Sequence, residues 1–294
     1  MAIAACRAEG QYPSLCCIIK VDPRIHRLMP CECRPPNYFE RISTVLELRN
    51  PHSVLAALKY RPQDVREIRV PIGRPQGAWA DVADAARTEK ISVVAQQLDA
   101  GARRGKKTQG KSERVGIATA MVIDHPGMLT PGTMLNTVAN SDGNTSGLWL
   151  ALDCLQDPHN VGAIFRTAAF FGVRGVLLTK DRSAPMTATV YDVAAGGVES
   201  VPFCLVPNLA HSLETAKKAG LWLLGTSEHE STSYVDIQHD RPWLLVIGNE
   251  EKGLRRLTLD TCDVVCGIPP QGEVTSLNAS VAAAIMIARL SPPS

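Results

Sequence analysis

Apolar residues in the second half of the chain fall into short runs separated by helical patterns. Five runs have the length of a buried strand and lie at residues 148–152, 175–179, 221–226, 243–248 and 264–268. After the first run, a buried helix face is marked by apolar residues at helical spacing, namely Val161, Ile164, Phe165, Ala168 and Ala169. Strands that alternate with helices predict a mostly parallel sheet covered on both faces. Ligands of such sheets bind beyond the carboxyl ends of the strands.

Two further helices complete the predicted second half. Asn208 is placed to cap a helix that runs to Gly220, and residues 276–290 predict an alanine-rich final helix.

The first half shows the same alternation more weakly. Its pattern predicts a helix at residues 51–60 that Ser53 caps. A strand, a helix, a strand and a further strand then follow at residues 65–72, 79–90, 91–94 and 115–123. This order predicts a smaller α/β domain.

Residues 127–147 separate the two halves. They are rich in glycine, proline, asparagine and serine, which is typical of a linker. The predicted segments are therefore an N-terminal extension, a small domain, a linker and a larger domain, at residues 1–37, 38–126, 127–147 and 148–294.

Composition places the chain among ordinary globular proteins. It has 294 residues, of which 45% are hydrophobic and 20% charged, with a net charge of +2. No apolar run reaches the roughly 18 residues that span a bilayer, so we expect no membrane association. The extension contains prolines and both signs of charge. A disordered extension, a non-standard start and a targeting sequence therefore all fit it.

The cysteines do not form a pattern typical of a zinc site. Those in the first 33 residues lack paired C-x₂-C spacing. The others lie in or beside apolar runs and are expected to be buried as small hydrophobic side chains, namely Cys154, Cys204, Cys262 and Cys266. A reducing compartment is the simpler inference.

A basic run precedes the last predicted strand of the small domain. It includes Arg103, Arg104, Lys106 and Lys107, and its glycines predict a loop. Two interpretations of this run are equally favoured: a loop that contacts RNA phosphates, and a solvated flexible loop with no binding role.

Three polar segments follow predicted strands of the larger domain, where a ligand is expected. In the first, Asn160 lies at the start of a helix and Arg166 lies off its apolar stripe. For this segment alone, a helix cap and an exposed arginine are the better explanation of these two residues, since both are common. In the second, Gly248 and Gly253 let a ligand approach the backbone closely. Its spacing is neither that of a dinucleotide fingerprint nor that of a P-loop.

The third polar segment lies at residues 268–280, at the entry to the final helix. Its polar side chains include Ser276 and Asn278, and capping by Ser276 is the plain structural interpretation.

Together, these segments resemble the three motifs of the SpoU/TrmH branch of the SPOUT RNA methyltransferases, over residues 148–290. The first motif, Asn-x₅-Arg, is matched by Asn160 and Arg166. The second, a hydrophobic strand ending in Gly-x-Glu-x-x-Gly, is matched by Gly248, Glu250 and Gly253. The third, an Ile-Pro segment followed by Ser-Leu-Asn-x-Ser, is matched by Ile268, Pro269, Ser276, Leu277, Asn278 and Ser280.

The resemblance implies an α/β SPOUT domain with a C-terminal trefoil knot, preceded by a smaller L30e-like α/β domain that binds the RNA substrate. It also implies a homodimer whose active site lies near the interface. The implied activity is S-adenosylmethionine-dependent 2′-O-methylation of a ribose in RNA, without a metal. Within the family, the chain most resembles the branch that methylates a guanosine of mitochondrial large-subunit rRNA. This likeness implies rRNA as the substrate and the mitochondrial matrix as the location.

The family's functional positions carry over to the matching residues. The resemblance places in the catalytic site Arg166, Asn160, Glu250, Ser276 and Asn278. It places around the cofactor Thr226, Gly248, Gly253, Ile268 and Leu277. A free guanidinium is essentially always protonated. We therefore expect Arg166 to bind phosphate and stabilise developing oxyanion charge rather than act as a simple base.

Other functions stay open at this point. The same chemistry on tRNA fits the residues equally, because the basic run does not distinguish RNA species. A catalytically silent RNA-binding ribosome-assembly factor is disfavoured by four intact motif residues, Asn160, Arg166, Glu250 and Asn278. An unrelated nucleotide-binding α/β enzyme is disfavoured by the absent phosphate-loop spacing.

Overall fold

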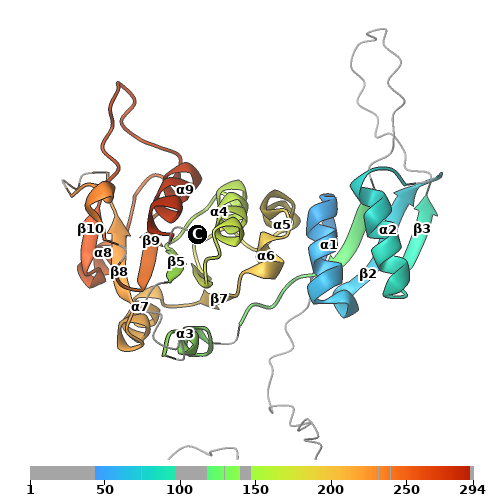
Figure 1. The fold of residues 1–294 in the computed structure, drawn as a ribbon, viewed down its shortest axis with the longest axis horizontal. Helices are drawn as coiled ribbons and strands as arrows, with labels where there is room; N and C mark the ends of the chain where they lie inside the picture. The colour runs from blue at the N-terminus through green and yellow to red at the C-terminus, as the bar shows by residue number, and fades with distance from the viewer. Residues whose placement is uncertain are drawn as a thin grey trace, which may run out of the picture. The chain divides into compact units, whose positions relative to one another are not determined.

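The computed structural model describes residues 44–73, 75–96, 118–128, 130–139, 147–228, 230, 232–238 and 240–291. Within it, Ser43–Ser294 cluster as one compact unit that contains two sheets (Figure 1). The predicted extension at residues 1–37 lies outside the described residues. So does the basic run with Arg103, Arg104, Lys106 and Lys107.

The first half contains a smaller sheet with helices, which is consistent with the predicted α/β domain. Its strand order is β1-β4-β2-β3, and only the β2–β3 pair is parallel. The strands are β1 Val45–Leu48, β2 Val65–Pro71, β3 Ser92–Gln96 and β4 Thr119–Ile123. The helices are α1 Pro51–Tyr60, the 3₁₀ turn η1 Pro62–Asp64, and α2 Ala78–Thr88. The sequence pattern missed β1, a short strand whose apolar side chains alternate over only four residues.

Helix α1 begins earlier than its predicted cap allows. Asn50 caps it, with its side-chain oxygen accepting from the His52 N–H at 3.0 Å. Ser53 was the predicted cap, and that prediction is wrong because Pro51 already stands in the first turn. The buried Ser53 hydroxyl instead donates to the Tyr191 carbonyl at 2.6 Å. A side chain expected to cap the start of a helix therefore connects the two halves of the unit.

The larger sheet is fully parallel, whereas the sequence pattern predicted a mostly parallel sheet and missed its edge strand at residues 203–206. Its strand order is β10-β8-β9-β5-β6-β7, and every neighbouring pair is parallel. The strands are β5 Leu148–Leu152, β6 Gly175–Thr179, β7 Phe203–Val206, β8 Trp222–Thr226, β9 Trp243–Ile247 and β10 Val264–Cys266. The C-terminal trefoil knot stays a prediction.

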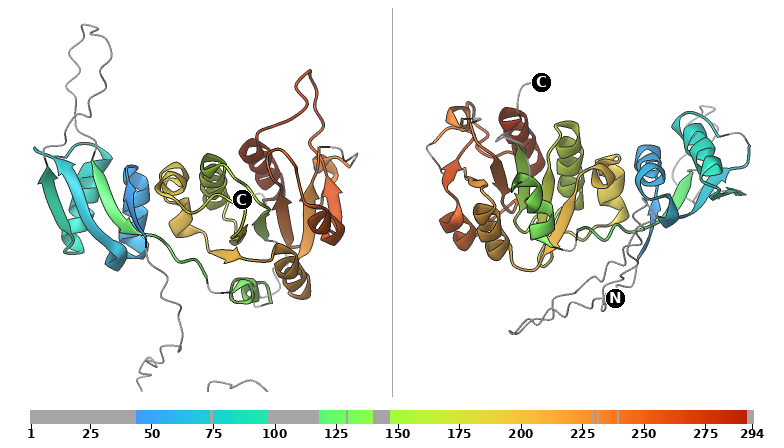
Figure 2. Two further views of the ribbon diagram at one scale, coloured as in Figure 1. Left: turned by 180° about the vertical axis from the view of Figure 1, so that it is seen from behind. Right: turned by 60° about the horizontal axis from the view of Figure 1, so that its bottom comes forward.

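Helices cover both faces of the larger sheet (Figures 1 and 2). One face carries α4 Pro158–Phe170, α5 Ala188–Ala194, α6 Gly197–Ser200 and α9 Ala279–Leu290. The other carries α3 Pro131–Ala139, α7 Leu209–Lys218 and α8 Arg256–Thr261. A 3₁₀ turn, η2 Tyr234–Asp236, lies before β9. Alternate strand residues serve the two cores: Leu150 packs on the α4 side and Trp149 on the α7 side.

The cysteines of the larger domain follow their predicted role. Cys154, Cys204 and Cys266 are buried and Cys262 is partly buried, and all four are free thiols. Within the described ranges, no helix combines the length and the apolar character that crossing a membrane requires.

Helix α3 lies inside the stretch predicted to be a linker. Its Met134 and Leu135 side chains are buried under the larger sheet. Met134 packs so closely on β6 that a Cβ on Gly175 would lie 2.5 Å from its sulfur. The composition concealed this helix, because two apolar side chains suffice to anchor it and a proline is favourable in a first helical turn. The predicted domain limits at residues 126, 127, 147 and 148 stay predictions.

A buried ion pair connects the residue that follows α1, Arg61, to Glu199 in α6. The Arg61 guanidinium donates from Nε and Nη2 to the two carboxylate oxygens of Glu199, each at 2.7 Å. The side chains of Arg61 and Glu199 are only 6% and 1% exposed. Arg61 also donates to the Ile123 carbonyl and pairs with Asp64. We call this group the Arg61–Glu199 joint.

Candidate functional site

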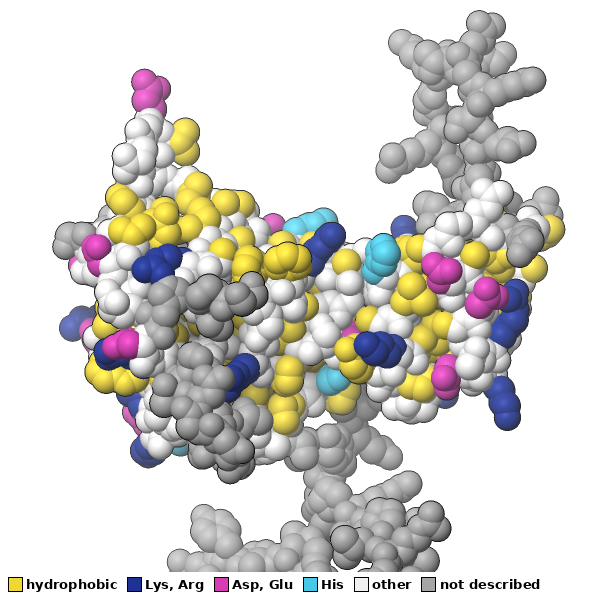
Figure 3. All heavy atoms as spheres, in the orientation of Figure 1, with side chains coloured by type: hydrophobic (Ala, Val, Ile, Leu, Met, Phe, Trp, Pro, Cys, Tyr) yellow, Lys and Arg dark blue, Asp and Glu magenta, His cyan; other side chains and the backbone are white. Residues whose placement is uncertain are grey.

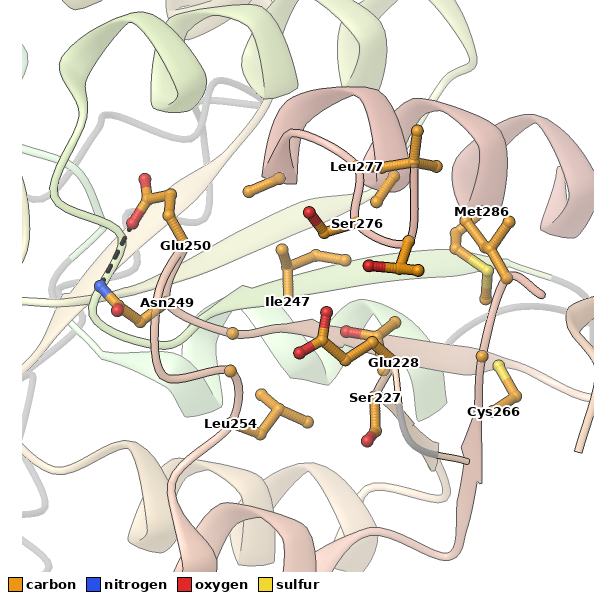
Figure 4. Close-up of a pocket in the computed structure, with 18 of the residues that line it drawn as sticks. Ser227, Glu228, Ile247, Asn249, Glu250, Leu254, Cys266, Ser276, Leu277 and Met286 are labelled. Atoms are coloured by element: carbon orange, nitrogen blue, oxygen red, sulfur yellow. Dashed lines mark hydrogen bonds between the residues drawn. The ribbon is translucent and has the colours of Figure 1, made fainter. Parts of the chain in front are cut away.

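A cavity of about 510 Å³ lies at the carboxyl ends of β8, β9 and β10 (Figure 4). We call it the strand-end cavity. Thr226 and the two residues after it form one wall, the loop after β9 forms a second, and the segment between β10 and α9 forms a third. This is the edge of the sheet where the parallel topology predicts a ligand.

The loop after β9 is a closed turn built around Asn249. The Asn249 N–H donates to the Gly253 carbonyl at 3.0 Å, and the Gly253 N–H donates back at 2.9 Å. The Asn249 side-chain oxygen accepts from the Glu251 and Lys252 N–H groups, each at 3.1 Å. A Cβ on Gly248 would lie 2.3 Å from the Gly253 carbonyl carbon. Glycine at 248 is therefore required by the turn itself, and Asn249 is a structural residue that the sequence pattern missed.

Glu250 joins this loop to the start of α4. It accepts from Asn160 Nδ2 at 3.1 Å and from the Gln156 and Asp157 N–H groups at 3.3 Å each. Asn160 is buried within α4 and does not cap the helix, because Asp157 caps it by accepting from the His159 N–H. Asn160 and Glu250, which the family motifs place in one site, are therefore in direct contact.

Asp153 anchors the far end of the same loop. It follows β5 directly and is fully buried, with one carboxylate oxygen 2.7 Å from Arg255 Nη2. Its other oxygen accepts from the Thr258 hydroxyl at 2.8 Å. Sequence reasoning missed Asp153, although a carboxylate immediately after a buried strand was a signal for it. Asp153 and Glu250 together fix the loop that forms the second wall.

The third wall is apolar at its base. Ile268, Leu277 and Met286 line the strand-end cavity, and Ser276 faces it beside them (Figure 4). Asn278, not Ser276, caps α9, because the helix begins at residue 279. The Asn278 side-chain oxygen accepts from the Ser280 N–H at 2.9 Å and from the Ser280 hydroxyl at 2.6 Å. Capping by Ser276 is thus corrected, and Ser276 stays available to a ligand.

The side chains of the strand-end cavity are suited to binding a ligand through polar and apolar contacts. Burial, with a smaller contribution from Glu230, raises the pKa of the Cys266 thiol to about 12, so this thiol is neutral near pH 7. Thr226 donates its hydroxyl to the Val246 carbonyl at 3.0 Å. The Glu228 carboxylate points into the cavity (Figure 4). Among the described residues, no three His, Cys, Asp or Glu side chains gather as a metal-binding group.

Most of the predicted site residues meet at this cavity. It is lined by Thr226, Gly248, Glu250, Gly253, Ile268, Ser276 and Leu277. Of the described residues predicted for the site, Asn160, Arg166 and Asn278 do not line it. Arg166 is exposed on α4, beside a different hollow of the surface. It has no hydrogen-bond or ion-pair partner within the described part of the chain.

Comparisons with known proteins agree with this geometry. The model of the SpoU rRNA Methylase family matches residues 147–288. The 23S rRNA (guanosine-2'-O-)-methyltransferase RlmB of Nitrosomonas europaea is 34% identical over 241 residues, which cover 80% of this chain and 87% of that protein. The Bordetella pertussis protein of the same name is 36% identical over 249 residues, 80% of this chain and 92% of its own length.

A solved structure shows the same fold. The SpoU methyltransferase AviRb from Streptomyces viridochromogenes, crystallised with AdoMet, superposes with a TM-score of 0.65 at 24% identity. The superposition covers 84% of this chain and 89% of that one.

Proposed function

The chain belongs to the SpoU rRNA methylase family, and we propose that it transfers a methyl group from S-adenosylmethionine to the ribose 2′-oxygen of a guanosine in large-subunit rRNA. One observation carries the proposal: all three family motifs contribute to, or directly brace, a single cavity at adjacent strand ends. The named activity of the two bacterial relatives supports guanosine in 23S-type rRNA as the target.

The strand-end cavity fits S-adenosylmethionine. Its volume of about 510 Å³ lies in the range of cofactor sites. The apolar side chains of Ile268 and Leu277 suit the face of an adenine ring, and the loop backbone near Gly248 offers close polar contacts. The Glu228 carboxylate is placed to accept from ribose hydroxyls or an ammonium group. When bound, S-adenosylmethionine supplies a methyl group already activated on a sulfonium sulfur.

The protein must then align the ribose and assist loss of the 2′-hydroxyl proton. Arg166 is free to contact the RNA, and its permanent charge suits a phosphate or the oxyanion that develops at the 2′-oxygen. Asn160 and Glu250 position the start of α4, and thereby the helix that carries Arg166. Ser276 is at hand to orient the ribose.

Arg166 does not line the strand-end cavity of its own chain, and a homodimer accounts for this position. In the proposed dimer, Arg166 of one subunit serves the cavity of the other. Hydrophobic side chains gather over the base of the loop between β10 and α9 (Figure 3). Three exposed apolar side chains belong to this loop and to the first turns of α9, namely Val274, Leu277 and Val281. An exposed apolar patch of this kind marks an interaction site, and it adjoins the proposed active site.

Calorimetry tests the cofactor assignment. The protein is expected to bind S-adenosylmethionine in the presence of EDTA, and Gly248→Ala should weaken binding by at least about tenfold because the new Cβ collides with the turn backbone. Gly132→Ala is the matched control, since the nearest atom to its Cβ lies 3.9 Å away and the residue is remote from the cavity. Equal binding by all three proteins, or none by a folded wild type, contradicts the assignment.

Light scattering tests the dimer. Val281→Asp should convert a dimer to a monomer at micromolar concentration, because it buries a charge in the proposed interface. Leu257→Asp is the control, because Leu257 is also an exposed apolar side chain but lies on α8, which covers the other face of the sheet. A monomeric wild type, or a dimer that only Leu257→Asp disrupts, rejects the proposed interface.

We further propose that the target is mitochondrial large-subunit rRNA and that the protein acts in the matrix. The support is the family branch that the sequence resembles, while the matched relatives are bacterial. Mapping 2′-O-methylated nucleotides in cells with and without the protein decides the substrate. Loss of a methyl group from tRNA alone would contradict the rRNA assignment, and fractionation of the protein outside mitochondria would contradict the location.

A further inference from the structure

A second hollow, about 460 Å³ in volume, lies beside Arg166 and apart from the strand-end cavity. Helix α1 contributes Lys59 and Tyr60, and helix α4 contributes Arg166 and Phe170. The turn between α5 and α6, at residues 194–197, also lines it. In Figure 1, α5 and α6 lie beside α1. We call this hollow the Phe170 groove.

Two glycines in the lining of the Phe170 groove lie close to the neighbouring helices. Gly196 has a φ of +96°, and a Cβ there would lie 2.9 Å from the Ala56 Cβ on α1. A Cβ on Gly197 would lie 2.5 Å from the Phe165 carbonyl oxygen on α4. Two glycines therefore let both helices approach the turn, and the hollow between the helices stays open above it.

Two aromatic rings stand exposed in the groove. Phe170 is 83% exposed and Tyr60 is 52% exposed, although burial of such rings is strongly favourable. Phe170 contacts Phe171 edge-on, with ring centroids 5.0 Å apart and an interplanar angle of 77°. Because the Phe170 side chain stays 83% exposed despite this contact, most of its ring is accessible to a flat partner.

The charge in the groove is positive. Lys59 and Arg166 both line it, and among its described lining residues none is acidic. The carboxylates nearby are engaged elsewhere: Glu199 is buried against Arg61, and Asp192 accepts from the N–H groups of Arg49 and Asn50. Exposed rings together with unopposed cations are the combination that binds single-stranded nucleic acid, through base stacking and phosphate contacts.

We propose that the Phe170 groove holds a nucleotide of single-stranded RNA adjacent to the methylated ribose, with its base stacked on Phe170 and its phosphate contacted by Lys59. The proposal rests on the proposed function, since Arg166 borders the groove and links it to the reaction. The proposal also specifies the secondary structure of the substrate. A base inside a duplex is not available to stack on a protein ring, so the nucleotide beside the target, and with it the target segment, is unpaired.

Fluorescence anisotropy with a short fluorescein-labelled single-stranded RNA of mixed sequence tests the groove. Phe170→Leu keeps an apolar side chain but removes the flat ring, so RNA affinity should fall about 5- to 100-fold. Phe170→Tyr restores a ring and should restore the affinity. Lys59→Ala should reduce the salt slope by about 0.7, as expected for one lost phosphate contact. Leu257→Ala and Lys218→Ala, on α8 and α7 outside the groove, should bind as the wild type does.

Affinity for S-adenosylmethionine and the mass of the protein are measured on the same samples, and both should be unchanged. A wild type that binds the cofactor and RNA, with unchanged RNA affinity in Phe170→Leu and Lys59→Ala, overturns the groove alone. A wild type that binds neither overturns the proposed function as well. If Phe170→Leu changes the mass and leaves RNA affinity intact, the groove is a contact between copies of the chain, and the proposal is wrong.

Discussion

Arg61→Ala is expected to lower the free energy of unfolding by about 3–5 kcal/mol, the largest stability change that we predict for one side chain. The substitution leaves the Glu199 carboxylate buried without its cation, since that side chain is 1% exposed and both its oxygens accept from Arg61. It also removes the donor to the Ile123 carbonyl. Because the Arg61–Glu199 joint connects the end of α1 to α6, part of the lost stability should come from weaker packing between these two helices.

Two comparisons sharpen the test of the joint by urea unfolding. Arg87→Ala breaks a pair with Asp84 in which both side chains are largely exposed, and it should cost less than about 1 kcal/mol. The double change Arg61→Met with Glu199→Met removes both buried charges and should be far less destabilising than Arg61→Ala. If Arg61→Ala costs no more than Arg87→Ala, the Arg61–Glu199 joint does not hold the two halves together.

Arg166→Ala is expected to reduce kcat by about 10²–10³-fold, the largest effect on activity that we predict. Arg166 is exposed on α4, opposite the buried face of that helix, so the fold should survive the substitution. Binding of S-adenosylmethionine should be nearly unchanged, because Arg166 does not line the strand-end cavity. Arg166→Lys keeps the charge but loses the planar fork, and it should not restore full activity.

Single-turnover methyl transfer, followed at both subsaturating and saturating RNA, measures this effect. Normal rates in Arg166→Ala at every RNA concentration would show that the residue has no role in the reaction. If saturating RNA restores the rate, Arg166 binds the substrate, in keeping with its place beside the Phe170 groove, and does not stabilise the transition state.

The sequence predicted the larger sheet well because parallel strands buried on both faces are continuous apolar runs. The runs at β5, β6, β8 and β9 and the face of α4 needed no tertiary information. Helix α3 escaped detection because its anchorage consists of Met134 and Leu135, a signal too short to outweigh the glycines and prolines around it.

Side-chain roles were harder to predict, because capping and pairing depend on where elements begin and meet. Ser53 and Ser276 have the chemistry of caps, yet each lies a few residues from the true helix start. Asn160 and Glu250 are 90 positions apart in the sequence. Only the resemblance to the family motifs assigned both of them to one site before the structure showed their contact. Arg61 and Glu199 belong to no motif, so only the folded chain reveals their contact.

The central claim is that this chain methylates a ribose 2′-oxygen of RNA. It is tested most directly by incubating the purified protein with S-adenosylmethionine labelled in its methyl group and large-subunit rRNA that lacks modification, followed by digestion to nucleosides. The account predicts label in 2′-O-methylguanosine, in the presence of EDTA, at a single position, and about 10²–10³-fold less in Arg166→Ala over the same time. Label in a base-methylated nucleoside, or none at all from a protein that binds both cofactor and RNA, would contradict it.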